Sequence, residues 1–408
     1  MPIVVMKFGG TSVGTVERIQ AVADRVVRAR EGGDDVIVVV SAMGDTTDDL
    51  TAMALQIADV PDPREMDMLL TAGERIAMSL LGIALNARGC RAASYTGSQA
   101  GIITDTQHGK AKIVEIRPKR VVEALEAGNV VVLAGFQGLS TRYEITTLGR
   151  GASDLTAVAM AGAVGAEVCE IYTDVDGVYT ADPNIVPDAR KLPRVAYDEM
   201  LEMASLGAKV LQARSVEFAK KYGVAVHVRS TFKPDPGTLV TREESGMEEV
   251  VVTGITHDRS QAKISLLRVP DRPGIAAQVF GAVAAKNIVV DMIVQNISRD
   301  GFTDISFTVP RGDHLRAQTA LQEIGHTVGA EKVVHDERVA KVSIVGVGMR
   351  SHSGVAARMF AALSKEGINI QMISTSEIAV SCVIEDKYAE LAVRALHDAF
   401  ELAKEREA

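Results

Sequence analysis

The chain begins MPIVVMKFGGTSVG (residues 1–14), in which an apolar run ends at one lysine, Lys7, and two glycines follow. The run from Ile3 to Phe8 predicts a buried strand with Lys7 near its end. Backbone N–H groups that glycines expose can cradle a phosphate, and a helix N-terminus adds positive potential. A strand followed by a tight glycine turn would give the same letters. Because the stretch is neither a Walker A loop nor a G-x-G-x-x-G fingerprint, both interpretations stay open.

Size, charge and cysteine content restrict the class of protein. At roughly 150 residues per domain, 408 residues suggest two or three domains. A formal net charge of -9 argues against a nucleic-acid partner, since such binding depends on cationic contacts to phosphate. Three widely spaced cysteines, Cys90, Cys169 and Cys382, show neither a disulfide framework nor metal spacing and indicate a reducing compartment. The histidines show no ligand spacing either, and no metal-binding residue is expected.

No charged-then-apolar leader precedes the first predicted strand, and no apolar run reaches the roughly 18 residues of a membrane span. We therefore expect a cytoplasmic protein with no membrane partner.

Strands and helices alternate through the first half of the chain. Continuous apolar runs such as 36–40 are typical of strands buried on both faces of a sheet, and periodic apolar positions predict helices between them. We expect an α/β sandwich with a mostly parallel central sheet over residues 1–232. The predicted strands are 3–8, 36–40, 130–134, 167–172 and 224–229, and the predicted helices are 16–31, 63–88 and 154–164.

A linker rich in proline and charge is predicted over residues 233–248. Beyond it lies an internal repeat, because Pro273–Phe280 aligns with Ser353–Phe360 and the offset of 80 (353 minus 273) continues without gaps. Each repeat reads as strand, helix, two strands, helix and strand, the order of a ferredoxin-like βαββαβ domain. We expect these domains over residues 249–335 and 336–408.

Polar side chains follow the ends of predicted strands, the edge at which open α/β sheets bind ligands. Ser41 and Thr47 follow the strand 36–40, although hydroxyls at such places more often cap turns. Glu74 follows Gly73 inside a predicted helix, where a glycine costs about 1 kcal/mol and suggests close approach of another group. An exposed glutamate beside an incidental glycine is the plainer alternative.

Three later stretches carry further candidates. LGRGASD (148–154) opens a helix and offers Arg150, a natural bidentate partner of carboxylate or phosphate, and Asp154, which could also be a simple cap. YTDVDGVYTADP (172–183) carries three acidic residues that either lie in turns or contact a nucleotide, and GAKV (207–210) adds Lys209.

Together, KFGGTSV, TAGER, GRGASD, YTDVDGVYTADP and GAKVL, in this order, resemble the aspartate kinases of the amino-acid kinase family. The paired repeats resemble ACT domains, the regulatory modules of those enzymes that bind amino acids. The resemblance covers essentially the whole chain. It implies transfer of the γ-phosphoryl group of ATP to the β-carboxylate of L-aspartate, with Mg²⁺ as cofactor. Such a reaction needs positioning and charge neutralisation more than a strong base, which agrees with the absence of a Ser/His/Asp or Cys/His arrangement.

The resemblance also assigns roles in catalysis and substrate binding. Lys7 would stabilise charge on the transferring group and Asp154 would orient the cationic side chains, while Glu74 would hold the α-amino group of aspartate and Arg150 a carboxylate. Further aspartate contacts are expected at Ser41, Thr47, Gly151 and Ser153, and ATP contacts at Lys7, Phe8, Gly9, Gly10, Thr173, Asp174, Tyr179, Asp182, Lys209 and Val210. Ala152 departs from the glycine usual in the family, and an alanine would be strained if this position required a positive φ.

For regulation, the resemblance implies feedback inhibition by lysine, threonine or both. The matching effector residues are Asp271, Val289, Val290, Asp291 and Gln295 in the first repeat and Asn369, Ile370 and Ser376 in the second. It also implies an oligomer held through the ACT domains. This would be either a homodimer or an α₂β₂ assembly whose smaller subunit starts internally at Met247. Methionine is common in this chain, with 15 residues, so the internal start stays an open alternative.

Two other functions remain possible from the sequence. One is a related kinase that acts on glutamate or acetylglutamate, but the ACT pair and the TAGER motif favour aspartate. The other is a non-catalytic amino-acid sensor, but the joint presence of Lys7, Glu74, Arg150 and Asp154 argues against it.

Overall fold

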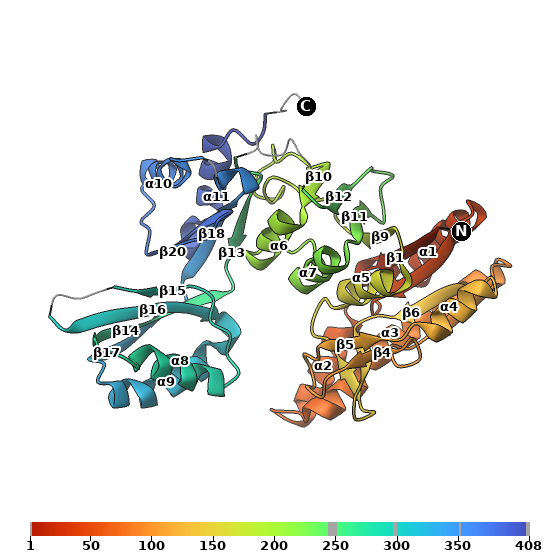
Figure 1. Cartoon of the computed structure of the whole chain (residues 1–408), viewed down its shortest axis with the longest axis horizontal. Helices are drawn as coiled ribbons and strands as arrows, with labels where there is room; N and C mark the ends of the chain where they lie inside the picture. Colours follow the sequence, from red (N-terminus) through yellow and green to blue (C-terminus); the bar gives the residue numbers. More distant parts are fainter. Residues whose placement is uncertain (1, 244–250, 297–299, 351, 405–408) are drawn as a thin grey trace. The chain divides into compact units, whose positions relative to one another are not determined.

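The computed structural model describes residues 2–243, 251–296, 300–350 and 352–404 (Figure 1). Contacts divide the chain into two compact units. The N-terminal unit comprises residues 1–178, 191–204 and 209–244, and the C-terminal unit comprises 179–190, 205–208 and 245–408. Residues 179–190 were predicted to belong to the kinase domain, but they belong to the C-terminal unit, where Ala181 and Val186 enter the core cluster of the second repeat.

The N-terminal unit contains an eight-stranded sheet in the order β10-β12-β11-β9-β1-β2-β6-β3. All neighbouring pairs are parallel except β11 with β12. Strand β1, the first strand of the chain, lies between β9 and β2, so its carboxyl end lies in the middle of the sheet edge. The strands are β1 (Ile3–Phe8), β2 (Asp35–Val40), β3 (Ala92–Tyr95), β6 (Val130–Ala134), β9 (Val168–Thr173), β10 (Arg194–Ala196), β11 (Ala225–Ser230) and β12 (Thr238–Thr241).

Helices cover both faces of this sheet. On one face, Met6 and Phe8 of β1 join a buried cluster with the apolar sides of α1 and α3. Since side chains alternate along a strand, Lys7 points to the other face, where α5 packs on β1 and against α7. The helices are α1 (Val16–Glu31), α2 (Thr46–Ile57), α3 (Pro63–Ala87), α4 (Lys119–Glu126), α5 (Ser153–Val164), α6 (Tyr197–Ser205) and α7 (Ala213–Tyr222), with a short 3-10 turn at Gly10–Val13.

A second, smaller sheet in the order β5-β4-β7-β8 completes the N-terminal unit. Its strands are β4 (Ile102–Thr104), β5 (Ile113–Ile116), β7 (Gln137–Ser140) and β8 (Ile145–Thr147). None of these short strands was predicted from the sequence. Strand β8 contacts α3 and leads directly into the loop that precedes α5.

Helix α3 is the one helix among the described residues that is long and apolar enough, by length and composition alone, to cross a membrane. Its apolar residues Ala77, Leu81 and Leu85 belong to the buried cluster beneath the main sheet. The helix also carries buried acids, Asp67 and Glu74. It therefore serves here as a core helix of the N-terminal unit.

The C-terminal unit contains two four-stranded antiparallel sheets, one for each repeat. The first repeat consists of β14 (Gln261–Pro270), α8 (Ile275–Ala285), β15 (Ile293–Gln295), β16 (Phe302–Pro310), α9 (His314–Val328) and β17 (Lys332–Asp336). The second consists of β18 (Val339–Val345), α10 (Val355–Lys365), β19 (Met372–Thr375), β20 (Ala379–Glu385) and α11 (Ala389–Ala399). The expected α/β sandwich with a mostly parallel sheet, followed by two ferredoxin-like domains, is thus confirmed.

One strand departs from the repeat predicted from the sequence. The second sheet runs β13-β18-β20-β19, and its edge strand β13 (Gly254–Asp258) precedes the first repeat in the chain. These residues were predicted to belong to the first repeat domain (249–335), yet Ile255 pairs with Ile344 of the second repeat. Within the described residues no strand follows α11, and β13 lies beside β18 at the position that β17 takes beside β14 in the first sheet.

Candidate active site and effector pocket

Lys7 and Asp154 form a buried ion pair at the carboxyl edge of the main sheet. Lys7 lies near the end of β1 and Asp154 in the first turn of α5, with 2.7 Å between Nζ and Oδ1. Both side chains are about nine-tenths buried, with exposed fractions of 11% and 9%. A charge held at this depth, beside a helix N-terminus, is suited to a ligand that carries negative charge.

The glycines after Lys7 permit close packing of two loops. A Cβ at Gly10 would lie 3.0 Å from the carbonyl oxygen of Ala42, and the Gly44 N–H donates a hydrogen bond to Gly10 O at 3.1 Å. The Gly9 N–H donates to Tyr172 O at 3.1 Å, so it is engaged within the fold. A Cβ at Gly9 would come within 3.5 Å of Lys7 Nζ, and its absence leaves room around the ammonium group.

Glu74 is buried beside the loop that follows β2. Its exposed fraction is 3%, and Oε1 accepts a hydrogen bond from the Ala42 N–H at 3.2 Å. Its second oxygen, Oε2, is buried without a hydrogen-bond partner among the described residues. Burial raises the pKa of Glu74 to about 7, because the desolvated carboxylate is disfavoured. A buried acid with one free oxygen is suited to a cationic ligand.

Gly73 explains how Glu74 comes so close to that loop. A Cβ at Gly73 would lie 2.7 Å from the Ala42 Cβ, so only glycine lets α3 approach here. The neighbouring Ser41 donates its N–H to Phe8 O at 3.1 Å and its side chain is half-buried. Thr47 lies in the first turn of α2, also half-buried.

The loop before α5 takes its shape from two glycines with positive φ. Gly149 has φ +94° and Gly151 has φ +74°, whereas Ala152 has φ -75°. Ala152 is therefore unstrained, and its fully buried side chain packs in an apolar cluster with Leu148 and Leu155. Ser153 is buried against Gly135, where a Cβ would lie 2.7 Å from the serine hydroxyl.

Arg150 extends from this loop into solvent. Its side chain is 78% exposed and forms an ion pair with the exposed Asp48 of α2. Two contacts from Gln212 hold the loop in place, and sequence reasoning missed them. The Gln212 side-chain amide donates to Arg150 O at 3.0 Å, and its backbone N–H donates to Asp154 Oδ2 at 3.4 Å. Position 212 follows directly after the GAKVL motif, which was the available signal.

The predicted nucleotide contacts fall into two groups. In the N-terminal unit, Phe8 is fully buried and stacks on Tyr172 at 4.8 Å, while Thr173 and Asp174 follow at the end of β9, the neighbour of β1. Lys209 is exposed and Val210 half-buried in the same unit. Tyr179 and Asp182 belong to the C-terminal unit. There the Asp182 carboxylate accepts hydrogen bonds from the Asn184 backbone and side-chain N–H groups at 2.9 and 3.0 Å, which stabilise a turn.

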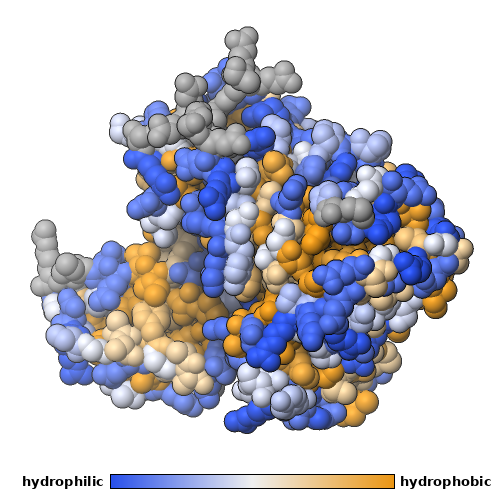
Figure 2. Space-filling model, turned by 45° about the vertical axis from the view of Figure 1, so that its right-hand side comes forward, coloured by the Kyte–Doolittle hydropathy of each residue, from blue (hydrophilic) through white to orange (hydrophobic). Residues whose placement is uncertain are grey.

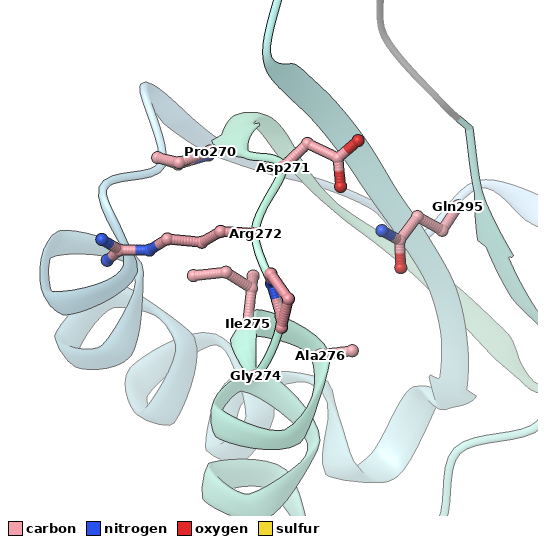
Figure 3. A pocket seen from close by; sticks show the side chains of 8 residues that line it. Pro270, Asp271, Arg272, Gly274, Ile275, Ala276 and Gln295 are labelled. Atoms are coloured by element: carbon pink, nitrogen blue, oxygen red, sulfur yellow. The ribbon is translucent and has the colours of Figure 1, made fainter.

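A pocket of about 400 Å³ lies at the start of α8 in the first repeat (Figure 3). It brings together Asp271, which follows β14, and Gln295 of β15, two of the predicted effector residues. Both are exposed, and Gly274, with φ +95°, begins the helix between them. The remaining lining residues are Pro270, Arg272, Pro273, Ile275 and Ala276.

The other predicted effector residues lie outside that pocket. In the first repeat, Val289 is 70% exposed, Val290 is half-buried and Asp291 forms an ion pair with Lys341 of β18, whose side chain is 1% exposed. In the second repeat, Asn369 and Ser376 are exposed and Ile370 is half-buried, and none of the three lines the pocket.

A reciprocal contact relates the two repeats. Asp291 and Gln371 occupy matching positions at the offset of 80 (371 minus 291), and each meets a lysine from the other repeat. Lys341 of the second repeat pairs with Asp291, and Lys263 of the first donates to Gln371 Oε1 at 2.7 Å. Each repeat therefore supplies a lysine to the other, which meets an acid in the first repeat and an amide in the second.

Comparison with known proteins agrees with these observations. The sequence profile of the Amino acid kinase family matches residues 2–230, and profiles of the ACT domain match residues 264–325 and 342–400. An aspartokinase of Pseudomonas aeruginosa is 56% identical over 404 residues, which cover 98% of each chain.

Two solved structures of Escherichia coli aspartokinase III, each 27% identical in sequence, also match. The one in complex with aspartate and ADP has a TM-score of 0.83 and covers 97% of this chain and 99% of that one. The one in complex with lysine and aspartate has a TM-score of 0.75 and covers 98% and 99%.

Proposed function

This chain belongs to the amino acid kinase family and carries the activity of an aspartate kinase, and from that premise we propose which residues perform the reaction. The γ-phosphoryl group of ATP passes to the β-carboxylate of L-aspartate and gives 4-phospho-L-aspartate. Because this carboxylate is already a nucleophile, the site has to position two anions and neutralise the charge on the phosphoryl oxygens. The observation that carries the proposal is the buried pair of Lys7 with Asp154 at the end of the central strand.

In this proposal Lys7 is the catalytic cation. Its ammonium group stabilises the charge that develops on the transferring phosphoryl group, and Asp154 keeps the lysine side chain oriented toward the sheet edge. The 2.7 Å contact and the depth of both side chains support these roles, since a charge fixed in a buried site is worth more than one in water. Gly9 leaves the space beside the ammonium open, since a Cβ there would lie 3.5 Å from Lys7 Nζ.

Recognition of aspartate is assigned to the loops on either side of this pair. The free Oε2 of Glu74 receives the α-amino group, and Arg150 binds the α-carboxylate, the one that is not phosphorylated. Further contacts come from Ser41, Thr47, Gly151 and Ser153, which lie in the same two loops or the first turns of α2 and α5. Arg150 is exposed and pairs with Asp48, which is exposed as well, so a substrate carboxylate can compete for it.

ATP is assigned to the edge formed by β1 and β9. The residues of this unit are Lys7, Phe8, Gly9, Gly10, Thr173, Asp174, Lys209 and Val210, while Tyr179 and Asp182 of the C-terminal unit stay predictions from the resemblance. Since Phe8 is fully buried, its contribution is through its backbone.

Mg²⁺ is proposed as the cofactor that neutralises the ATP phosphates. Within the described ranges, no three His, Cys, Asp or Glu side chains are grouped to hold a metal ion. The magnesium ion would be held chiefly by phosphate oxygens and water, as is usual for Mg²⁺ in kinases.

Feedback inhibition by lysine, threonine or both is proposed at the first repeat. The pocket at the start of α8 offers a carboxylate, Asp271, for an α-amino group and a helix N-terminus for an α-carboxylate. An aspartokinase with 27% identity has been solved in complex with lysine, which supports lysine as one effector. Val289, Val290, Asp291, Asn369, Ile370 and Ser376 complete the proposed effector residues.

An oligomer through the ACT domains is proposed as the working form. Hydrophobic side chains gather on the lobe that carries the first repeat (Figure 2), and Val289 and Ile293 there are 70% and 53% exposed. Ile293 lies on β15, an edge strand of its sheet, and exposed apolar edges favour association. The partner is either a second full chain or a smaller subunit started at Met247, in an α₂β₂ assembly.

Met247 lies outside the described residues, within the linker predicted at 233–248 between the kinase domain (1–232) and the repeats (249–335 and 336–408). That linker is partly wrong, because residues 238–241 form strand β12, which pairs with β11 in the main sheet. Expression of the natural coding sequence tests the internal start. A co-purifying polypeptide that begins at Met247 supports it, and a single full-length product that does not change when the Met247 codon is altered overturns it.

A cytoplasmic location is part of the proposal. It is supported by the cysteines, since Cys90, Cys169 and Cys382 are all free thiols. Such thiols are typical of a reducing compartment.

One assay tests the activity itself. The acyl phosphate product is captured with hydroxylamine in reactions that contain ATP, Mg²⁺ and either L-aspartate, glutamate or acetylglutamate, with and without added lysine and threonine. The account expects hydroxamate from aspartate alone, with less of it when an effector is present. Hydroxamate from glutamate or acetylglutamate instead would assign the chain to a neighbouring kinase, and none from any acceptor would make it a sensor.

A further inference from the structure

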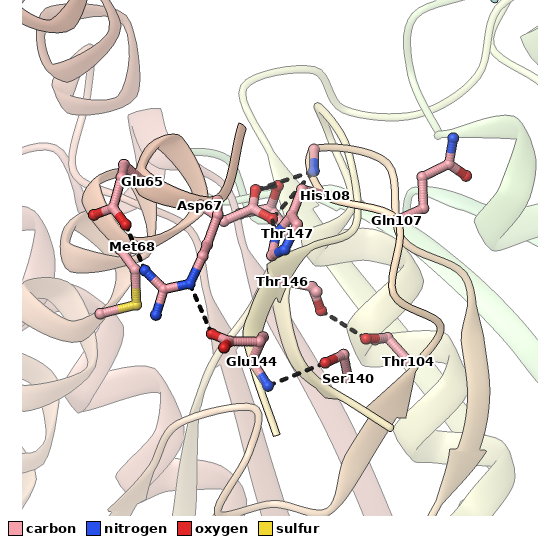
Figure 4. Close-up of polar contacts among 12 residues, drawn as sticks. Glu65, Asp67, Met68, Thr104, Gln107, His108, Ser140, Glu144, Thr146 and Thr147 are labelled. Carbon is pink, nitrogen blue, oxygen red and sulfur yellow. Dashed lines mark hydrogen bonds and ion pairs between the residues drawn. The ribbon is translucent and has the colours of Figure 1, made fainter. Parts of the chain in front are cut away.

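Asp67 is a fully buried carboxylate that the reaction as proposed does not use. It lies near the start of α3 with an exposed fraction of 1% and is surrounded by hydrogen-bond donors (Figure 4). The Thr147 hydroxyl donates to Oδ1 at 2.5 Å, His108 Nδ1 donates to Oδ2 at 2.7 Å, and the Gly109 N–H lies 3.1 Å from both oxygens. Because a carboxylate only accepts, His108 must carry its proton on Nδ1.

These donors come from the two segments that border the arginine loop. Thr147 ends β8 and is followed by Leu148, Gly149 and Arg150. The 108–110 segment packs on that loop, since a Cβ at Gly149 would lie 3.7 Å from Gly109 O. One further cation, Arg214, joins the same segments by donating to Leu148 O at 2.6 Å and to Ala111 O at 3.1 Å.

Asp67 and Glu74 share one face of α3, because seven residues make two helical turns. Glu74 faces the loop after β2, and Asp67 faces the loop that carries Arg150. A single rigid helix thus supports both the group assigned to the amino end of the substrate and the loop assigned to its carboxylate end.

We infer that Asp67 is a positioning residue for the substrate. By holding Thr147 and Gly109, Asp67 fixes the Gly149–Gly151 loop relative to Glu74. It thereby sets the distance between the group that binds the amino end of the substrate and the group that binds its carboxylate end. The inference rests on the proposed function of Arg150 and Glu74. It predicts that loosening the contact impairs binding of aspartate more than it impairs binding of ATP or phosphoryl transfer.

Two adjacent threonines of β8 provide a matched test. Thr147 bonds to Asp67, whereas Thr146, also fully buried, bonds to the Thr104 hydroxyl at 2.6 Å. Thr147→Val and Thr146→Val each remove one buried hydroxyl from the same strand and keep its shape. We expect Thr147→Val to raise the KM for aspartate by about five- to tenfold, the effect of one buried hydrogen bond lost. Thr146→Val should leave it within twofold.

Steady-state kinetics with both substrates separates the outcomes. The inference is supported if Thr147→Val raises the aspartate KM alone, with kcat and the KM for ATP within twofold, and if Thr147→Ser restores the wild-type value. Equal effects of the two valine variants, or a parallel rise in both KM values, would mean a merely structural role and overturn it.

Asp67→Asn gives a second measurement if Thr147→Val fails to fold, and an unchanged aspartate KM in that variant also overturns the inference. Failure of the proposed function is distinguishable from these results, because the wild-type chain itself would then form no product from aspartate.

Discussion

The active-site edge of the N-terminal unit and the pocket of the first repeat differ in how far their polar side chains are exposed to solvent. At the sheet edge, Lys7, Asp154 and Glu74 are buried and held by the fold. At the start of α8, Asp271 and Gln295 are exposed and line an open pocket. A site that stabilises a transition state gains from fixed, desolvated charges, whereas a site that senses a free amino acid has to fill and empty.

The largest effect is expected from removing Lys7, which breaks its buried ion pair with Asp154. We predict that Lys7→Ala lowers kcat by about 100-fold or more, as for loss of one preorganised donor, and lowers kcat/KM for aspartate to a similar extent. Stopped-time assays of product formation measure kcat and kcat/KM, and circular dichroism checks that the variant is folded. Lys119→Ala, which removes an exposed lysine of the same unit, is the control. Activity of the Lys7 variant within a few-fold of wild type would contradict the assignment.

Arg150 sharpens the comparison, because it is an exposed charge beside a buried site. We predict that Arg150→Ala raises the KM for aspartate by about tenfold and leaves the KM for ATP unchanged, since one charged hydrogen-bonding partner is lost. Asp48→Ala is the matched control, because it removes the partner of Arg150 and keeps the arginine. An ATP defect with a normal aspartate KM would show that the role is wrong.

Titration of Glu74 should make the activity of the buried site depend on pH. With its pKa raised to about 7, the carboxylate is neutralised as pH falls below 7, so affinity for the substrate ammonium should fall there. We predict that kcat/KM for aspartate declines below about pH 7 and that this limb is missing in Glu74→Gln, whose activity is lower throughout. Glu65→Gln, at an exposed position of the same helix, should keep the wild-type profile.

The raised pKa of Glu74 also makes the stability of the fold depend on pH. Between the ordinary value of 4.5 and about 7, the folded chain holds more protons on Glu74 than the unfolded chain. The contribution of Glu74 to stability is therefore present below pH 4.5 and is lost as pH rises through about 7. We predict that Glu74→Gln unfolds at higher denaturant concentration than wild type at pH 8 and loses this advantage at pH 4.5. Equal differences at both pH values would contradict the burial of a charged Glu74.

The smallest effect on basal activity is expected in the effector pocket. We predict that Asp271→Ala keeps kcat and both KM values within twofold and raises the concentration of lysine or threonine needed for half inhibition by about tenfold, as for one charged hydrogen bond. Asp313→Ala, in the turn before α9 of the same repeat, is the control. Inhibition that stays at the wild-type concentrations for every amino acid tested would remove Asp271 from the effector residues.

Local signals in the sequence predicted much of this arrangement. The apolar run before Lys7 is a strand with the predicted bounds, and the glycine within TAGER marks a close approach, to Ala42. Features that depend on distant residues were missed. The donors to Asp67 lie 41, 42 and 80 positions away, and β13 pairs with a strand that begins 81 positions after its last residue (339 minus 258). No periodicity or motif reports such pairing, which is decided by packing.

The central claim is that catalysis and effector binding depend on separate sets of charges in the two units. Equilibrium binding of lysine and threonine, measured by calorimetry on Lys7→Ala and Asp271→Ala next to their turnover of aspartate, tests it most directly. The account predicts that the Lys7 variant binds the effector as wild type does but forms almost no product, and that the Asp271 variant forms product normally but binds the effector at least about tenfold more weakly. Loss of effector binding in the Lys7 variant, or loss of turnover in the Asp271 variant, would contradict it.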